Sequence, residues 1–413
     1  MYQLYNKRHQ TSIRTIPMEP EEHVLEIMHD LGINVVLTLP CDRIKALLSM
    51  AESEFFTIPL TREENGIGIC AGAYMAGARP LMMIQSTGLG NMINAIASLN
   101  QVYDLPLPII ASWRGVYKEG IAAQIPFGEH LPGILKGAGI EYTIIEDASE
   151  IDKVGDVIRD AFENEHTHVA LMSPKVWEDS TCTPLSISCG PQKRTTDVHY
   201  IATIPEPIMT RYDAIVATVS AVSSDGLGKR DDKGGDYDKD NCKDVIISNI
   251  GAPCKELYAA KDRDANFYMM GSLGLASAIG LGMALFSKRR VYVLDGDGSI
   301  LMNPSALLET AVQKPVNLTI ICLDNSSYGS TGDQLTCTGS VVDLELFAKA
   351  CGIKNTTKVH TQEGLVQAIG AGYTFIHTII KPGNRACMNI PLSAKEIKVR
   401  FMKQMLGKEM KYS

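Results

Sequence analysis

An aspartate between two glycines ends an apolar stretch in the second half of the chain. The segment reads VYVLDGDGSILMN over residues 291–303, with Asp297 between Gly296 and Gly298. Glycines on both sides allow the backbone to come close to a ligand and to adopt positive φ. Backbone N–H groups in such a turn can hold phosphate oxygens, while a carboxylate can hold a cation. A tight turn without a ligand is the simpler interpretation of this segment on its own.

A second polar residue follows the next apolar stretch. Asn325 ends LTIICLDN (318–325) and lies 325 − 297 = 28 positions after Asp297, which leaves room for one helix and one strand. Adjacent parallel strands bring their carboxyl ends to the same edge of a sheet, where α/β proteins bind ligands. Carboxylate, amide and backbone oxygens are the ligands that Mg²⁺ prefers. Two ordinary strand-end turns are the alternative, but the pair favours a magnesium and phosphate site.

Apolar segments that recur along the chain are predicted to be the strands that position these residues. In the first half they are 33–40, 80–88, 107–113 and 168–174, and in the second half 244–251, 291–296, 318–325 and 375–383. Helix-like segments lie between them, for example 21–32 and 304–314, and Asn303 with Pro304 is typical of a helix start. Buried strands with helical crossovers indicate an α/β fold of parallel sheets flanked by helices.

Composition divides the chain into two α/β domains. Residues 18–180 form the first domain and 209–413 the second. Residues 181–208 are predicted to be a linker, because proline, serine and threonine gather there and periodicity is lost. Within the second domain, residues 223–243 carry too much charge and glycine to support a core, which predicts a mobile surface loop.

Composition and charge exclude several classes of protein. The chain has 413 residues, of which 45% are hydrophobic and 21% charged, as in soluble globular proteins. A net charge of −8 without a basic patch argues against nucleic-acid binding. No apolar run is long enough to span a membrane, and the N-terminal segment lacks the apolar region of a signal peptide. Ten cysteines without C-x-x-C or zinc spacing indicate reduced, mostly structural thiols in a cytoplasmic protein.

The stretch GDGSILMNPSALLETAVQKPVNLTIICLDNSSYG (296–329) resembles the diphosphate–magnesium motif of thiamine diphosphate enzymes. That motif is G-D-G followed after about 25–30 residues by N-N, and here Asp324 replaces the first asparagine. The resemblance implies that Asp297 and Asn325 are Mg²⁺ ligands, with the backbone carbonyl of Ser327 as a third. It also implies that the cofactor diphosphate lies along Gly298 and Ser299, and that the other cofactor contacts nearby are Gly251, Gly296 and Tyr328.

MMGSLGLASAIGLGMAL (269–285) is similar to the family segment whose backbone holds the aminopyrimidine ring of the cofactor. The match implies ring contacts from Gly271 and Ser272, and it makes Leu273 the apolar wedge that bends the cofactor into a V shape. An ordinary core residue at a helix start is the alternative for Leu273. The resemblance therefore implies two thiamine diphosphate-binding domains, a pyrimidine-binding domain followed by a diphosphate-binding domain.

Enzymes of this family need a glutamate from the pyrimidine-binding domain, hydrogen-bonded to the aminopyrimidine. IPLTREENGIGICAGAYMAGARP (58–80) has a strand-like start, two acids and a helix of small residues, so Glu63 and Glu64 are both candidates. Either acid could instead only stabilise the positive end of the helix. The family places the catalytic glutamate nine positions before a glycine, and 72 − 63 = 9 makes Gly72 the match for Glu63.

Three further segments resemble phosphonopyruvate and sulfopyruvate decarboxylases: MIQSTGLGNMINAIASL (83–99), LPIIASWRG (107–115) and AAQIPFGEH (122–130), as does the tail 382–401. They suggest substrate contacts from Ser86, Asn91, Arg114 and His130, although the segment 83–99 could instead be merely a capped turn. Arginine suits planar anionic groups, although a surface ion pair is the alternative for Arg114. His130 could donate a hydrogen bond or relay a proton, or it could be an ordinary loop residue. One departure from these relatives is APCKEL (252–257), which leaves the roles of Cys254 and Lys255 open.

The resemblance covers nearly the whole chain and implies the α and β parts of a sulfopyruvate decarboxylase fused in one polypeptide. The implied reaction is the decarboxylation of 3-sulfopyruvate to sulfoacetaldehyde and CO₂ with thiamine diphosphate and Mg²⁺, within coenzyme M biosynthesis in a methanogen. Phosphonopyruvate, or another 2-oxo acid, is the alternative substrate. We expect a homodimer or larger homo-oligomer with active sites between chains, and no nucleic-acid or membrane partner.

Overall fold

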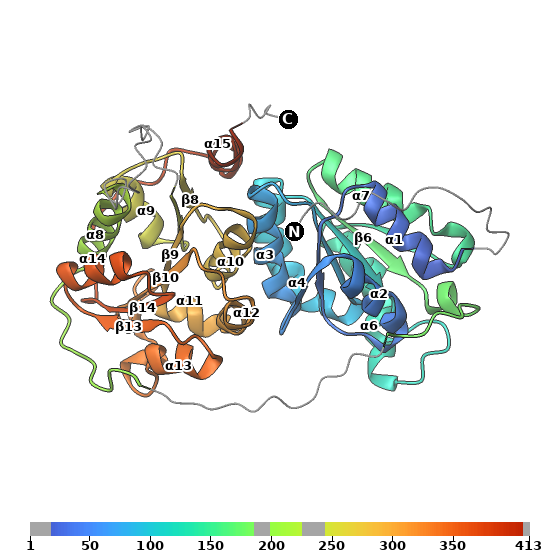
Figure 1. Ribbon diagram of the computed structural model, residues 1–413, viewed down its shortest axis with the longest axis horizontal. Helices are drawn as coiled ribbons and strands as arrows, with labels where there is room; N and C mark the ends of the chain where they lie inside the picture. Colours follow the sequence, from blue (N-terminus) through green and yellow to red (C-terminus); the bar gives the residue numbers. More distant parts are fainter. Residues whose placement is uncertain (1–17, 186–198, 225–243, 408–413) are drawn as a thin grey trace, which may run out of the picture.

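The computed structural model describes residues 18–185, 199–224 and 244–407 as two lobes that lie side by side (Figure 1). The N-terminal arm, residues 186–198 of the predicted linker and residues 225–243 of the predicted loop 223–243 lie outside the described residues. Residues 223 and 224, which we assigned to that loop, instead end a helix. No helix of the described ranges has the length and apolar character needed to cross a membrane.

The first lobe is a parallel sheet of six strands in the order β2-β1-β3-β4-β6-β5. These strands are β1 (Val35–Thr38), β2 (Phe56–Pro59), β3 (Pro80–Gln85), β4 (Leu107–Ser112), β5 (Glu141–Ile145) and β6 (Thr167–Met172). Its helices are α1 (Pro20–Asp30), α2 (Lys45–Glu54), α3 (Glu63–Met75), α4 (Leu89–Ala95), α5 (Gln101–Tyr103), α6 (Ile125–Gly137) and α7 (Lys153–Glu163). An apolar cluster of Val24, Leu47, Ile110 and Val157, among others, packs α1, α2 and α7 onto one face of the sheet.

The second lobe repeats this architecture with the strand order β13-β14-β10-β9-β7-β8, again all parallel. Its strands are β7 (Val245–Ser248), β8 (Asn266–Tyr268), β9 (Val291–Gly296), β10 (Leu318–Asp324), β13 (Thr356–Val359) and β14 (Phe375–Ile379), and β11 (Ser327–Tyr328) and β12 (Gln334–Leu335) form a small antiparallel pair. Its helices are α8 (Arg211–Ser224), α9 (Ala252–Ala260), α10 (Ala276–Phe286), α11 (Asp297–Met302), α12 (Ser305–Gln313), α13 (Leu344–Cys351), α14 (Gln362–Ala371) and α15 (Ala394–Leu406).

The prediction of two parallel α/β sheets flanked by helices is therefore confirmed, and the eight predicted strands are all present. The sequence did not reveal β5, β8 and β13, and it indicated only the end of β2. All four are edge strands of their sheets. An edge strand has one neighbour and one open side, and the short or partly polar sequences found there carry a weak apolar signal.

The two lobes share one core where α3 packs against α10 in the centre of Figure 1. Both helices are apolar on all sides, as expected of a helix that is surrounded by protein. Glycines allow the two backbones to touch: a Cβ added to Gly72 would lie 2.0 Å from the Ile279 carbonyl oxygen, and one added to Gly282 would lie 2.0 Å from that of Ile69. In this structure both helices of the contact belong to one chain.

A candidate cofactor site

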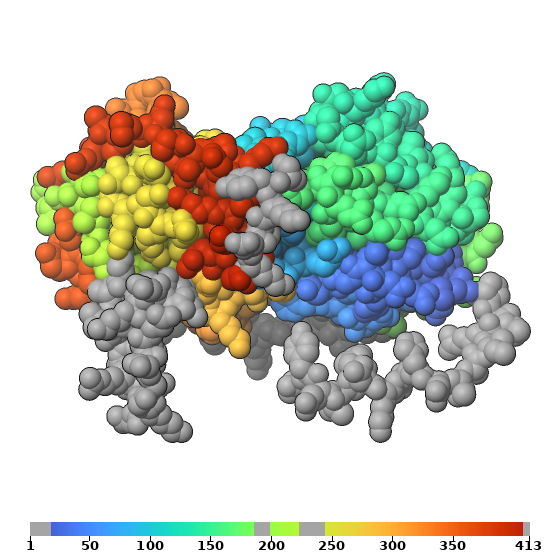
Figure 2. Space-filling model, turned by 90° about the horizontal axis from the view of Figure 1, so that it is seen from above, coloured from blue at the N-terminus to red at the C-terminus, as the bar shows by residue number. Residues whose placement is uncertain are grey.

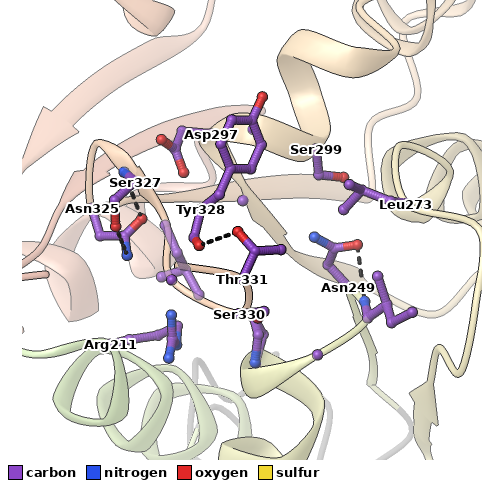
Figure 3. Close-up of a pocket in the computed structure, with 17 residues that line it drawn as sticks. Arg211, Asn249, Leu273, Asp297, Ser299, Asn325, Ser327, Tyr328, Ser330 and Thr331 are labelled. Atoms are coloured by element: carbon purple, nitrogen blue, oxygen red, sulfur yellow. Dashed lines mark hydrogen bonds between the residues drawn. The ribbon is translucent and has the colours of Figure 1, made fainter. Parts of the chain in front are cut away.

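A pocket of about 300 Å³ opens at the carboxyl ends of β7, β9 and β10 (Figure 3). The strand order reverses between β7 and β9, and open α/β sheets bind ligands at such a point. Among the residues that line the pocket are Gly251, Leu273, Gly296, Asp297, Gly298, Ser299, Asn325, Ser327 and Tyr328. The structure thus brings together nine of the residues that the sequence assigned to the cofactor and metal.

Asp297 is the central acid of this pocket. It starts α11 directly after β9 and is 3% exposed. Its Oδ2 accepts hydrogen bonds from Thr336 (2.5 Å) and Thr338 (3.2 Å), and no ion pair with a cationic side chain is found for it within the described ranges. Burial and the nearby charge of Asp324 raise the pKa of Asp297 to about 6. A buried carboxylate in this situation is stabilised by a bound cation.

Asp324, the departure from the family motif, is part of a buried ionic cluster. Its Oδ2 lies 2.7 Å from Nε2 of His377 on β14, and its Oδ1 accepts a hydrogen bond from Thr338 (2.8 Å). Burial alone would lower the pKa of His377, but Asp324 and Asp343 outweigh burial and raise it. Because His377 compensates the charge of Asp324, an aspartate is tolerated where the family motif has a neutral asparagine.

The turn around Asp297 has the clearance that a phosphate-bearing cofactor needs. A Cβ added to Gly298 would lie 2.3 Å from Cε1 of Tyr328, so only glycine lets the backbone pass under this ring. Gly251 has φ +94° and precedes α9, whose N-terminus faces the pocket through Gly251 and Pro253. A helix N-terminus favours anions. Asn325 adds an amide oxygen, which accepts a hydrogen bond from the Ser327 N–H (3.3 Å). The donor set therefore fits Mg²⁺ and a diphosphate.

Arg211 is a pocket residue that sequence reasoning missed. It begins α8 and lies across the pocket from Asp297 in Figure 3. Its guanidinium donates to both carboxylate oxygens of the buried Glu256 (3.1 and 2.9 Å) and to Oδ1 of Asn384 (2.6 Å). The segment TRYDA around it has no motif that marks a site, and only the packing of α8 beside α9 brings it to the pocket.

Gly271 and Ser272, assigned to the aminopyrimidine, lie where the first lobe touches the second. Ser272 has φ +59°, and its Oγ lies 2.6 Å from Oγ of Ser98 in the first lobe. The Tyr103 hydroxyl, also of the first lobe, donates to the Tyr268 carbonyl (2.7 Å) and accepts from the Met270 N–H (2.7 Å). These contacts fix the backbone of 268–272 beside Leu273, which faces the pocket.

Glu63 and Glu64 have different partners at the start of α3. The Glu63 carboxylate accepts a hydrogen bond from Nδ2 of Asn91 (3.1 Å), and its side chain lies against Gly88. The Glu64 carboxylate is bound by Arg62 (2.9 Å). The structure thus groups Glu63 with the 83–99 segment, while Glu64 pairs with its own helix start.

Asn303 differs from its predicted role as a helix cap. Its Nδ2 donates instead to Oδ1 of Asn65 on α3 (3.2 Å), and α12 begins at Ser305 without a side-chain cap. On the same side of α3, both the N–H and the hydroxyl of Thr61 donate to Oε1 of Glu309 on α12 (2.9 and 3.1 Å). The Asn303 side chain is used to join the lobes and is therefore not available to the helix end.

Arg114, Ser86 and Asn91 lie at the carboxyl edge of the first sheet. The Arg114 guanidinium is 2% exposed and binds Glu119 through two hydrogen bonds (2.7 and 3.0 Å) and Asp42 through one (2.7 Å). Its bond with Glu119 raises the pKa of Arg114 above its ordinary value and lowers that of Glu119 to about 2. Oγ of Ser86 accepts from the Arg114 N–H (2.9 Å).

The histidine assigned to the substrate lies on the surface of α6. His130 is exposed, although the neighbouring Gly128 packs tightly on the turn after β4. The Gly128 carbonyl accepts a hydrogen bond from Nε1 of Trp113 (2.9 Å), and a Cβ at Gly128 would lie 1.9 Å from the Arg114 carbonyl oxygen. The two segments that resemble the decarboxylases, W-R-G and F-G-E-H, are therefore in contact.

Cys254, left open by the sequence, has a packing role. Its thiol is buried and lies 3.0–3.3 Å from the carbonyl oxygens of Ser248, Asn249 and Met269. Burial raises the pKa of this thiol to about 12. Through these contacts the Cys254 side chain holds the start of α9 against the ends of β7 and β8, behind the residues that line the pocket. All cysteines within the described ranges are free thiols.

The fold and the pocket define a protein that binds thiamine diphosphate, also called thiamine pyrophosphate. Residues 18–138 match the N-terminal TPP-binding domain of thiamine pyrophosphate enzymes, and residues 254–378 match the C-terminal TPP-binding domain. The chain is 51% identical to a sulfopyruvate decarboxylase of Methanosarcina acetivorans over 93% of its own length and 97% of the relative's. It belongs to the decarboxylases of the thiamine pyrophosphate enzyme family.

Other relatives agree with this assignment. A phosphonopyruvate decarboxylase of Streptomyces hygroscopicus is 30% identical, with 90% of each chain covered. Separate sulfopyruvate decarboxylase subunits match parts of the chain: a beta subunit of Methanocaldococcus jannaschii is 45% identical over 39% of it, and an alpha subunit of Methanococcus maripaludis is 40% identical over 32%. Each of these two matches covers 87% of the length of the subunit concerned. The fold is also that of benzoylformate decarboxylase from Polynucleobacter necessarius, with a TM-score of 0.62, 13% identity, and coverage of 89% of this chain and 99% of that one.

Proposed function

We propose that this chain decarboxylates 3-sulfopyruvate to sulfoacetaldehyde and CO₂, with thiamine diphosphate and Mg²⁺ as cofactors. The observation that carries this proposal is the buried Asp297–Asn325 pair at the strand-order reversal, in a chain half identical to a sulfopyruvate decarboxylase. The proposed domains are 18–180 for pyrimidine binding and 209–413 for diphosphate binding, joined by 181–208.

The proposed metal ligands are the Asp297 carboxylate, the Asn325 amide oxygen and the Ser327 backbone carbonyl. These oxygens leave coordination positions for diphosphate oxygens, as Mg²⁺ sites commonly do. The backbone N–H groups of Gly298 and Ser299, together with the N-terminal end of α9, would hold the diphosphate. Leu273 would support the bend of the cofactor, because it projects into the pocket between Ser299 and Asn249 in Figure 3.

Glu63 is the proposed catalytic residue. When bound, the thiazolium ring of thiamine diphosphate supplies the electron sink that lets CO₂ leave a 2-oxo acid. The Glu63 carboxyl would hold a proton at the ring nitrogen of the aminopyrimidine, and Asn91 would orient that carboxyl through their hydrogen bond. Glu64 is the alternative, and its carboxylate is bound by Arg62 of its own helix start rather than by the 83–99 segment.

The proposed contacts for the anionic end of the substrate are Ser86, Asn91, Arg114 and His130. Glu119 fixes the orientation of the Arg114 guanidinium through a buried bidentate pair. The guanidinium also donates from Nη1 to Asp42, whose side chain is 66% exposed, and to Oε1 of Gln85 (3.1 Å). We propose that a sulfonate takes the place of Asp42 at Nη1 of Arg114, which leaves the buried guanidinium paired with an anion and lets the exposed Asp42 side chain turn to solvent.

Phosphonopyruvate is the second candidate substrate, since a phosphonopyruvate decarboxylase is also a full-length relative. The test measures aldehyde release from sulfopyruvate, phosphonopyruvate and pyruvate, each with and without thiamine diphosphate and Mg²⁺. We expect cofactor-dependent turnover with the highest kcat/KM for sulfopyruvate. A preference for phosphonopyruvate would overturn the substrate but keep the chemistry, whereas turnover without the cofactor would overturn the whole proposal.

The wider setting is also part of the proposal. The substrate places the enzyme in coenzyme M biosynthesis in the cytoplasm of a methanogenic archaeon. We propose a homodimer or larger homo-oligomer without nucleic-acid or membrane partners. The resemblance implies active sites between chains, whereas α3 and α10 also meet within one chain, so a mixing experiment is needed to distinguish the two arrangements.

A further inference from the structure

A group of metal-binding side chains lies in the first lobe, away from the cofactor pocket. Asp160 is on α7, His166 is in the turn that follows, and His168 is on β6. The turn joins α7 and β6 in the right-hand lobe of Figure 1. Oδ2 of Asp160 lies 2.7 Å from Nε2 of His166 and 2.5 Å from Nδ1 of His168. One carboxylate oxygen is therefore shared by two imidazole rings.

The donor set suits a divalent transition metal. Two imidazole nitrogens and one carboxylate oxygen are preferred ligands of Zn²⁺, and the three ligand atoms all lie within 4.8 Å of one another. With metal–ligand bonds of about 2.0–2.2 Å, tetrahedral ligand atoms are separated by roughly 3.3 Å. Each ring therefore needs to move away from Asp160 by less than about 1 Å to make room for an ion. The bound ion would replace the protons that the three side chains now share.

Neighbouring side chains hold two of the three ligands in place. Nε2 of His168 lies 2.9 Å from Oγ1 of Thr143, which leaves Nδ1 directed at the shared oxygen. Oδ1 of Asp160 accepts a hydrogen bond from Nδ2 of Asn164 (2.7 Å), which leaves Oδ2 directed at the two imidazole rings as the ligand atom. Metal-binding histidines and carboxylates commonly have such supporting bonds, because the bonds fix the ring and carboxylate orientation.

The group is accessible and carries the right charge. The side chains of Asp160, His166 and His168 are 35%, 30% and 13% exposed, so an ion can enter from solvent and keep a water ligand. Partial burial would raise the pKa of Asp160, but the hydrogen bonds from His168, Asn164 and His166 outweigh it and leave the pKa below its ordinary value. The carboxylate is thus ionised at neutral pH, as a ligand must be.

We propose that Asp160, His166 and His168 bind one Zn²⁺ ion, or a first-row divalent metal of similar preference, with water completing the coordination. The role is structural. Between Asp160 and His166 the chain turns through Glu165, whose φ is +50° and whose carboxylate binds Lys398 of α15 (2.9 Å). A metal at this turn holds Glu165 where it meets α15, which in turn packs on both lobes.

The first experiment measures metal stoichiometry in the full chain. The protein is stripped with chelator, saturated with thiamine diphosphate and excess Mg²⁺ so that the cofactor pocket is filled, equilibrated with Zn²⁺, desalted and analysed for metal. We expect one Zn²⁺ per chain in the unmodified protein and none in Asp160→Asn or His166→Ala. His29→Ala is the matched control, because His29 is an exposed histidine with a single acidic partner, Glu54. Equal zinc in the unmodified protein and both Asp160 and His166 variants would overturn the proposal.

The second experiment distinguishes a lost site from a misfolded variant. Co²⁺ in place of Zn²⁺ is expected to give the visible absorption of a low-symmetry nitrogen and oxygen site, absent in His166→Ala. Zn²⁺ is expected to raise the Tm of the unmodified protein and of His29→Ala but not that of the site variants, whose metal-free Tm stays close to that of the unmodified protein. An equal zinc-induced rise in Tm for His166→Ala would contradict the proposal, and so would unchanged cobalt absorption.

Discussion

At the scale of single residues, Thr338 has an unusual position. Its hydroxyl lies within hydrogen-bond distance of two buried carboxylates, Asp297 (3.2 Å) and Asp324 (2.8 Å), and of the Thr336 hydroxyl (2.9 Å). One hydroxyl hydrogen cannot satisfy both acids at once. Asp324 is already compensated by His377, so Asp297 is the acid that remains to be neutralised, and the proposed Mg²⁺ would do this.

The first prediction concerns this acid. Asp297→Asn removes the charged ligand and is expected to weaken Mg²⁺ binding by at least about 100-fold and to reduce turnover correspondingly. Asp333→Asn is the matched control, because Asp333 is an exposed acid of the neighbouring loop and loses the same charge. Calorimetric titration of Mg²⁺ in the presence of thiamine diphosphate measures the difference. Equal affinities for the two variants would show that Asp297 is not a ligand.

The second prediction separates the two glutamates. Glu63→Gln is expected to lower kcat by at least about 100-fold, because the amide cannot exchange a proton, while thiamine diphosphate affinity changes little. Glu64→Gln loses only an exposed ion pair with Arg62 and should keep turnover within a few-fold. Steady-state kinetics and cofactor titration of both variants provide the measurement. The reverse pattern would move the catalytic role to Glu64.

The convergence of Asp297, Asn325 and their neighbours on one pocket could be predicted, because they lie in two strand-end segments with a fixed spacing. Arg211, His377 and Thr338 could not. Arg211 lines the pocket, while His377 and Thr338 contact Asp324 beside it, and each sits in a segment whose local pattern is that of an ordinary helix, strand or turn. Arg114 was found at the predicted strand end, but its binding to Glu119 depends on a loop geometry that spacing does not contain.

At the scale of elements, the crossing of α3 and α10 decides how the lobes meet. The third prediction is that Gly72→Ala lowers the free energy of unfolding by at least about 1–3 kcal/mol. The methyl group of the alanine would overlap the Ile279 carbonyl and force the two helices apart. Gly133→Ala is the matched control: Gly133 lies inside α6, and a Cβ there would have nothing within 4 Å. Because alanine has a higher helix propensity than glycine, Gly133→Ala should instead raise the free energy of unfolding by roughly 0.5–1 kcal/mol. Thermal unfolding measures both. A stabilising Gly72→Ala would contradict the close packing.

The fourth prediction concerns the contact between α12 and the loop before α3. Burial raises the pKa of Glu309 to about 7, well above that of an unfolded carboxyl. Between about pH 4.5 and pH 7 the folded state therefore holds a proton that the unfolded state releases. The contribution of Glu309 to stability is fully present below about pH 4.5 and is lost as pH rises to about 7. The loss is roughly 3 kcal/mol. Glu309→Gln keeps an acceptor for Thr61 and should remove this part of the pH dependence.

Unfolding by urea at pH 5.5 and pH 8 measures this effect. The stability lost by the unmodified protein between the two values should exceed that lost by Glu309→Gln. Glu396→Gln is a control at an exposed carboxyl that caps α15, where the pKa is lowered by the Ser393 N–H and hydroxyl. An identical pH dependence for the unmodified protein and Glu309→Gln would show that this carboxyl is ionised in the folded state.

The sequence predicted strands correctly where both faces of the strand are buried. The central strands β1, β3, β4, β9 and β10 are almost fully buried and read as continuous apolar segments. The edge strand β5 has one buried residue out of five, and β8 has only three residues. Asn303 shows a different failure, since its local context favours a cap but the lobe contact with Asn65 uses the side chain instead.

At the scale of the whole molecule, the two lobes and their order followed from the sequence, but the pairing of the lobes did not. Sequence patterns describe which face of a helix is apolar, and they do not say which chain covers it. The segment 181–208 spans at most about 90–100 Å when extended, so it permits pairing within a chain or with a partner. In the structure, the shared core through α3 and α10 forms within one chain.

The fifth prediction tests this arrangement in solution. Equal amounts of Glu63→Gln and Asp297→Asn are mixed after gentle dissociation and reassociation. If each site takes both lobes from one chain, every site carries a defect and no activity returns, which is the expected result. If sites form between chains, mixed dimers contain one site with both residues intact and activity recovers to about a quarter of the unmodified level. Light scattering of the same samples gives the assembly size.

The shared core of α3 and α10 also has a consequence for enzyme concentration. Where two lobes are carried on separate subunits, the fraction of assembled sites falls as the proteins are diluted. Here the linker keeps the partner lobe at an effective concentration that is independent of the amount of enzyme, typically in the millimolar range for short flexible connections. Specific activity should therefore remain constant on dilution, even to levels at which a two-subunit enzyme would come apart.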